Sequence, residues 1–116
     1  MSDTTSHLAD LSVHAVLDGL TQRTVSTRQY LEALFERHDQ AEPMVRAFAW
    51  LDRSFAREQA DAADRRRAGG EAIGPLHGLP VGIKDVFDTA GIPTECGSPA
   101  FAGNVPRSEE HTSELQ

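Results

Sequence analysis

The chain has 116 residues, a formal net charge of −7 and a pI near 5.1. A chain of this length makes one small domain, which buries roughly two thirds of its unfolded surface if it folds alone. The acidic balance argues against nucleic acid or an anionic membrane surface as a partner, because both require clustered Lys and Arg. The one basic cluster, Arg65–Arg67, is explained more simply as the charged end of a helix.

Several other classes of function find no support in the sequence. Residues 1–10 contain no basic segment followed by an apolar run, and no stretch approaches the ~20 apolar residues of a membrane span, so we expect a cytoplasmic protein. The single Cys96 excludes an internal disulfide and a multi-thiolate metal site, and a semi-buried loop residue is its simplest interpretation. With no dinucleotide or P-loop motif and no ligand spacing among the five histidines, we expect neither a cofactor nor a metal.

Two amphipathic helices are predicted in the first third of the chain. Apolar residues at helical spacing predict a short helix over Ser12–Leu20, with Ser12 as its cap. The second is better signalled, because Ser26 and Gln29 form a capping box, and it should extend to about His38. Its expected hydrophobic staple and buried stripe consist of Val25, Tyr30, Leu31, Leu34 and Phe35.

Signals in the middle of the sequence predict a turn, a strand and a third helix. Pro43 should close the second helical region, and the β-prone run Val45–Leu51 is typical of a strand. Asp52 or Ser54 can cap a third helix that stops at Gly69-Gly70. The apolar side of this helix is narrow and rich in alanine, so we expect it to lie close against another element.

The composition changes after this helix. Six of the nine glycines and five of the six prolines fall between Gly74 and Pro106. Regular helix is therefore not expected there, and short strands joined by tight turns fit better, the clearest being Pro80–Val86.

The last ten residues, 107–116, show no apolar period. Their back-translation resembles the in-frame reading of a widely used sequencing adapter. We therefore expect residues 107–116 to be non-native, and residues 1–106 to be the N-terminal part of a larger domain whose natural reading frame is interrupted at about Pro106. The alternative is a genuine polar tail, and sequencing the source locus across this junction distinguishes the two.

Lys84 is the only lysine, against ten arginines, and it lies in the long apolar, Gly- and Pro-rich stretch Leu76–Ser98. Arginine keeps its proton in proteins, whereas a lysine stripped of water can lose it near neutral pH. A lysine in such a stretch is therefore a candidate general base.

The expected strand would give Lys84 a suitable setting. Side chains alternate along a strand, so Gly82, Lys84 and Val86 would share one face, with Asp85 on the other. Such a face offers space for a substrate and few charges. The alternative is an ordinary lysine that reaches water or pairs with Asp85 or Asp88.

The stretch Leu76–Ser98 closely resembles the lysine-bearing segment of the amidase signature family. The most specific part is Gly-Leu-Pro-Val-Gly-Ile-Lys-Asp at Gly78–Asp85, completed by Asp88–Gly91 and Gly97-Ser98. The resemblance spans about Ser12–Pro106. It implies an α/β fold, a mixed sheet covered by helices on both faces. This chain would supply the N-terminal helices and first strands and would be incomplete as a fold.

The resemblance also implies a Ser, cis-Ser, Lys triad that hydrolyses amides, with Lys84 as its lysine. The neutral lysine would take a proton through the cis-serine while the second serine attacks the carbonyl carbon. The family's Gly/Ser-rich stretch that bears both serines has no counterpart here. Ser98 matches a family position other than the nucleophile, and Ser108 and Ser113 belong to the suspect tail.

Other residues of the motif have simpler interpretations. His77 is expected to be structural, because no partner for acid–base chemistry is apparent. Asp85 and Asp88 should bind backbone N–H groups in turns, and Thr94 and Ser98 could support the site. The glycines of the motif should serve turns and close approaches, and they are Gly78, Gly82, Gly91 and Gly97.

Three functions remain open. The leading hypothesis is part of a stand-alone amidase that acts on a small-molecule amide, with a homodimer of the whole protein left open. The second is the amidase subunit of a glutamyl-tRNA amidotransferase, for which Asn-Ile is expected after the Lys-Asp pair in place of Val86-Phe87. The third is an inert, non-catalytic fragment.

Overall fold

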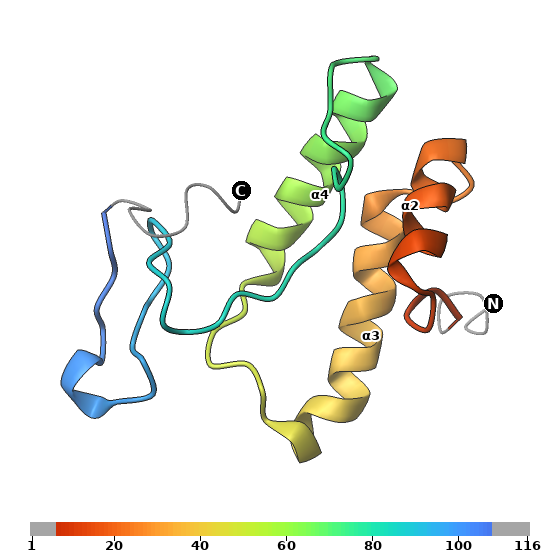
Figure 1. Cartoon of the computed structure of the whole chain (residues 1–116). Coiled ribbons are helices and arrows are strands. Elements are labelled where there is room, and N and C mark those ends of the chain that lie inside the picture. Colours follow the sequence, from red (N-terminus) through yellow and green to blue (C-terminus); the bar gives the residue numbers. More distant parts are fainter. Residues whose placement is uncertain (1–6, 108–116) are drawn as a thin grey trace. The chain divides into compact units, whose positions relative to one another are not determined.

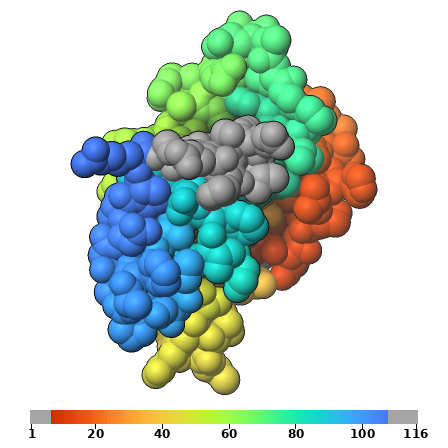
Figure 2. All heavy atoms as spheres, turned by 60° about the vertical axis from the view of Figure 1, so that its left-hand side comes forward, coloured from red at the N-terminus to blue at the C-terminus, as the bar shows by residue number. Residues whose placement is uncertain are grey.

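The computed structural model describes residues 7–107. The chain divides after Pro80 into two compact units. We call the described part of the first, residues 7–80, the helical unit, and that of the second, residues 81–107, the loop unit. Figure 1 shows helices α2, α3 and α4 in the helical unit. Figure 2 draws the same residues as spheres, with the loop unit coloured from cyan to blue.

Helix α2 (Val13–Gln22) begins where the sequence predicts. The Ser12 hydroxyl accepts a hydrogen bond from the N–H of Ala15 at 3.1 Å and so satisfies one of the free donors of the first turn. The helix ends at Arg23, whose φ of 62° is left-handed and directs its N–H back to the carbonyls of Gly19 and Leu20.

Helix α3 (Thr27–Val45) begins at the predicted capping box and is longer than predicted. Ser26 and Gln29 exchange the two expected bonds, at 2.9 and 3.0 Å. Pro43 lies inside the last turns instead of ending the helix, which corrects the prediction. A proline there removes one N–H donor, and the helix continues for only two more residues.

The strand predicted over Val45–Leu51 is absent, because its backbone donors are used elsewhere. The carboxylate of Glu42 accepts the N–H groups of Ala47 and Phe48 at 2.8 and 2.9 Å. These bonds hold the pKa of Glu42 below its usual range. The residues after α3 therefore fold back on its end in an irregular connection to α4.

Helix α4 (Arg53–Ala68) is capped by Asp52, whose carboxylate accepts the N–H of Phe55 at 3.1 Å. It stops at Gly69-Gly70 as predicted, after three arginines that favour the negative end of the helix dipole. α3 and α4 pack against each other and run in opposite directions, with α2 beside the start of α3 (Figure 1). Ala60 is buried, so the expected close packing of the alanine face is confirmed.

The core of the helical unit consists of two small apolar clusters. The first contains Val16, Leu20 and Val25 with Tyr30 packed against them, so the staple pair lies in one cluster as predicted. The second joins α3 to α4 through Leu31, Phe35 and Ala60. Within residues 7–107, no helix has the length and apolar character required to cross a membrane.

No β-strand is found in the loop unit as described, and the prediction of a strand over Pro80–Val86 is wrong. A strand needs a neighbouring strand to satisfy its backbone groups. Residues 81–107 contain only an isolated bridge between Thr89 and Ile92 and a short 3₁₀ helix, η1 (Pro99–Phe101). The unit is instead held by turns and by bonds between its loops.

Candidate active site

The lysine-bearing stretch Leu76–Ser98 begins in the helical unit and continues in the loop unit. Its first residues form hydrogen bonds with the helices. The His77 ring Nε2 lies 2.9 Å from the carbonyl oxygen of Ala63, and Arg67 donates to the His77 carbonyl at 2.8 Å. Because a carbonyl oxygen only accepts, Nε2 is the donor. His77 thus has the structural role that the sequence analysis expected.

Gly78 is needed where the motif approaches α3. Its carbonyl accepts from the Thr27 hydroxyl at 3.0 Å, its φ is 86°, and a Cβ at this position would lie 2.5 Å from Thr27 Oγ1. A residue with a side chain would meet both backbone strain and a steric clash. The expected backbone role of this glycine is confirmed.

Lys84 lies at the start of a tight turn in the loop unit. Its carbonyl accepts the N–H groups of Val86 at 2.7 Å and Phe87 at 3.2 Å. The alternating strand geometry expected around Lys84 is therefore wrong, because the chain turns directly after it.

The water-excluded setting predicted for Lys84 is not found among residues 7–107. Lys84 is exposed, and so are its apolar neighbours: Val81 has 72% of its surface exposed, Val86 49% and Phe87 40%. The apolar residues are present in the sequence, but among residues 81–107 they do not close over the amine.

Asp85 has the role predicted for it. Its carboxylate accepts the N–H of Glu95 at 2.9 Å, and its backbone carbonyl accepts the N–H of Cys96 at 3.0 Å. The bond found for this carboxylate is with the backbone and not with the Lys84 amine. The same expectation for Asp88 stays a prediction.

Cys96 is exposed, which corrects the expectation of a semi-buried residue. It lies with Gly97 in a turn closed by the bond from Ser98 N–H to the Glu95 carbonyl, and both central residues have positive φ, 52° and 67°. The Ser98 hydroxyl accepts from Ala100 at the start of η1, while Thr94 is buried with 3% of its surface exposed. These contacts support the backbone of the segment.

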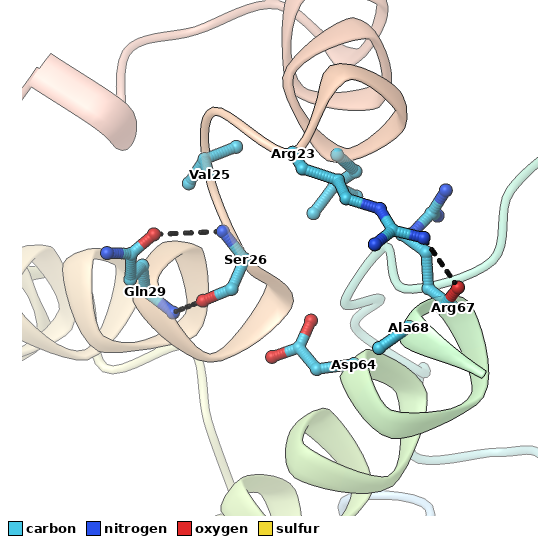
Figure 3. Close-up of a pocket in the computed structure, with 8 residues that line it drawn as sticks. Arg23, Val25, Ser26, Gln29, Asp64, Arg67 and Ala68 are labelled. Atoms are coloured by element: carbon cyan, nitrogen blue, oxygen red, sulfur yellow. Dashed lines mark hydrogen bonds between the residues drawn. The ribbon is translucent and has the colours of Figure 1, made fainter.

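A hollow of about 300 Å³ opens in the helical unit, between the end of α2, the start of α3 and the end of α4 (Figure 3). Some of its polar groups bind to one another: Arg23 donates to the Arg67 carbonyl at 3.2 Å, and Ser26 pairs with Gln29. None of its lining residues belongs to Leu76–Ser98. Nor do the described residues contain a group of three or more His, Cys, Asp or Glu side chains placed to hold a metal ion.

Asp64, which lines this hollow, was not predicted from the sequence to have a structural role. Its two carboxylate oxygens accept the N–H groups of Thr27 and Arg28 at 2.8 and 3.0 Å, so a residue of α4 caps the first turn of α3. No local signal indicates such a cap, because its partners lie 36 and 37 residues away.

Comparison with known proteins identifies the family. The profile of a family described as Amidase matches residues 29–115, so the chain belongs to the amidase family. A glutamyl-tRNA(Gln) amidotransferase subunit from Streptomyces avermitilis is 37% identical over 106 residues, which cover 91% of this chain and 21% of that protein. The corresponding protein, of the same name, from Chloroflexus aggregans is 42% identical over 96 residues, with coverages of 83% and 20%.

A solved structure also matches most of this chain. It is an inhibitor-bound vestigial protein complex connected with the evolutionary origins of an s-triazine catabolic enzyme. The match has a TM-score of 0.79 and 30% identity, and it covers 85% of this chain and 22% of that one. The family resemblance predicted from the lysine motif is thus confirmed, and the chain spans about a fifth of the length of the curated relatives it matches.

Proposed function

We propose that the chain is the lysine-bearing part of an amidase that hydrolyses the C–N bond of a small amide, with Lys84 as the residue that transfers the proton. One observation carries the proposal: the single lysine of the chain stands inside the motif Gly78–Asp85, within the region that matches the amidase family. Lys84 begins a tight turn, in which its carbonyl accepts the N–H groups of Val86 and Phe87.

The proposed reaction uses Lys84 as base and then as acid. Its neutral amine takes the proton of the nucleophilic serine through the cis-serine, the serine oxygen bonds to the amide carbon, and the proton passes to the leaving amine. Water then releases the acid and restores the serine. Both serines, and the strands of the mixed sheet, would come from the part of the protein that this chain does not include.

The exposure around Lys84 supports a site in which Lys84 comes from this chain and the two serines come from the rest of the protein. An amine that serves as a base near neutral pH must be shielded from water, and the exposed neighbours Val81, Val86 and Phe87 supply apolar surface for such a shield. In the whole protein we expect this surface to be covered. We also expect the location to be cytoplasmic.

The test begins with the source gene. Its sequence beyond Pro106 should encode in frame a Gly/Ser-rich segment with two serines, and the protein expressed from the complete gene should release ammonia from simple primary amides. A locus that encodes the ten residues 107–116 and then stops would contradict the proposal.

A second candidate function follows from the relatives, several of which are named as subunits of glutamyl-tRNA(Gln) amidotransferases. In that role, the protein would release ammonia from glutamine only together with partner proteins. Val86-Phe87 in place of the expected Asn-Ile favours the stand-alone enzyme. Ammonia release from glutamine only when partner proteins are added, with no turnover of simple amides by the protein alone, would favour the amidotransferase role.

The chain taken alone is a third case. Without the two serines we expect the 116-residue polypeptide to hydrolyse no amide. Turnover by this polypeptide that Lys84→Ala abolishes would show that all the catalytic groups are already present in it.

A further inference from the structure

The loop unit contains a network of hydrogen bonds that begins at the residue after Lys84. Asp85 is held twice: its carboxylate accepts the N–H of Glu95 at 2.9 Å and its carbonyl accepts the N–H of Cys96 at 3.0 Å. Two residues further along, the Phe87 carbonyl accepts from the buried Thr94 hydroxyl at 3.2 Å. The segments 85–87 and 94–96 are therefore tied side by side through three bonds.

A third segment, 103–106, holds the second one in place. Thr94 exchanges two bonds with Asn104: its N–H donates to the Asn104 carbonyl at 2.8 Å, and its own carbonyl accepts from the Asn104 side chain at 3.0 Å. The Glu95 carboxylate accepts the N–H of Gly103 at 2.9 Å. Glu95, the partner of Asp85, is thus itself held by hydrogen bonds. The bond between Glu95 and Asp85 therefore connects the backbone next to Lys84 to this network.

We propose that Asp85 is a positioning residue for Lys84, and this inference rests on the proposed function of Lys84. The turn that follows Lys84 is anchored at its second residue by the Asp85 carboxylate, which restricts the backbone from which the amine extends. When the orientation of a catalytic group is already fixed in the folded protein, the reaction step does not have to restrict it. A misplacement of about 1 Å can cost about 10²-fold in rate. Asp85 acts through the backbone and need not touch the substrate.

The inference can be tested on the chain itself, because selective ¹⁵N-lysine labelling gives a single backbone reporter, Lys84. We expect an order parameter S² for its amide of about 0.85, typical of rigid backbone, and a value below about 0.6 in Asp85→Ala. Asp85→Asn keeps one acceptor oxygen and should restore most of the rigidity. An S² already below about 0.6 in the unaltered chain, or an unchanged S² in Asp85→Ala, would overturn the inference.

The matched control is Asp52→Ala in the helical unit. Asp52 also accepts a backbone N–H through its carboxylate, at 3.1 Å from Phe55, so the chemical change is the same. We expect it to weaken α4 and to leave the Lys84 signal unchanged. A loss of order at Lys84 in both variants would mean that Asp85→Ala acts by general unfolding and would overturn the specific role.

A kinetic test on the protein from the complete source gene separates this inference from the proposed function. We expect Asp85→Ala to lower kcat by about 10²-fold with little change in KM, and Asp85→Asn to recover part of that loss. Full activity in Lys84→Ala would refute the proposed function itself. Loss of activity in Lys84→Ala together with unchanged kcat in Asp85→Ala would leave the function intact and refute the positioning role.

Discussion

The two units of the chain are held together in different ways. The helical unit combines capped helices with two apolar clusters, so much of its structure follows from signals a few residues apart. The loop unit has exposed apolar side chains and is ordered mainly by hydrogen bonds between loops about ten residues apart. The helical unit therefore has the simpler sequence signals, whereas the candidate catalytic lysine lies in the loop unit.

The largest effect is expected from removing the centre of the first apolar cluster. Leu20 is 1% exposed, and Leu20→Ala should lower the free energy of unfolding by about 2–5 kcal/mol because it leaves a cavity. Urea unfolding followed by far-UV circular dichroism measures this loss. Leu76→Ala is the control, since 60% of Leu76 is exposed. Equal losses in both variants would contradict a helical unit stabilised by its apolar clusters.

The second prediction concerns the cap that links α4 to α3. Asp64→Ala removes the acceptor of two backbone N–H groups, and we expect a loss of about 3 kcal/mol, because hydrogen bonds to a charged group contribute about 1.5–3 kcal/mol each. The control on the same helix is Asp61→Ala. Asp61 is half-exposed and pairs only with the Arg28 side chain among the described contacts, so its loss should stay below about 1 kcal/mol. The same urea titration reports both, and a smaller effect for Asp64 would rule out the inter-helix cap.

The third prediction sharpens the division between the units. Gly78→Ala places a Cβ against Thr27 Oγ1 and forces a side chain into a left-handed backbone, which should cost between about 1 and 3 kcal/mol of helical-unit stability. Gly82→Ala, in the same motif, meets no atom within 4 Å and should be nearly neutral. Thermal unfolding of the two variants compares them. A neutral Gly78→Ala would mean that the motif does not bind to α3 through this glycine.

The smallest effect is a pH dependence that arises in the helical unit. The hydrogen bond from Arg57 lowers the pKa of Glu32, and that from Arg53 lowers the pKa of Asp39. Each group therefore adds stability above its unfolded pKa of about 4, and that stability is lost as the pH falls through the lower folded pKa.

Glu32→Gln tests this prediction, because it should flatten the loss of stability below about pH 5. The change should be less than about 1 kcal/mol, since the Glu32 side chain is 36% exposed. Glu58→Gln, on the exposed face of α4, removes the same charge as a control. The midpoints of urea unfolding at several pH values measure this change. An identical loss of stability at acid pH in Glu32→Gln and the unaltered chain would exclude the assigned role of Arg57.

The helices could be predicted because their signals are local. Ser12, the Ser26 and Gln29 pair, and Asp52 each bind a donor within three residues. The end of α3 could not be predicted, because Pro43 is tolerated there and Glu42 binds the chain that follows. The two strands were predicted from residue composition, but a strand also depends on partner strands, which residues 7–107 do not supply.

Lys84 as the catalytic residue stays a prediction, and the geometry around it differs from the one expected. A single lysine within a specific motif indicated Lys84, and the turn-binding role of Asp85 followed from the ordinary behaviour of aspartate. The bonds between Thr94 and Asn104 could not be predicted, because residues ten apart in irregular loops leave no periodic pattern. The water-exposed setting of Lys84 was also missed, because an apolar stretch of sequence suggested burial, whereas Val81, Val86 and Phe87 are themselves exposed.

The most direct test of Lys84 as the proton-transferring residue is amide hydrolysis by the protein from the complete source gene, with Lys84→Ala and Lys84→Arg as variants. Both should lower kcat by about 10²- to 10⁴-fold while leaving the far-UV circular dichroism unchanged, because alanine has no base and arginine does not release its proton. Activity of Lys84→Arg within tenfold of the unaltered enzyme would contradict the account, as would the absence of amide turnover by the unaltered protein.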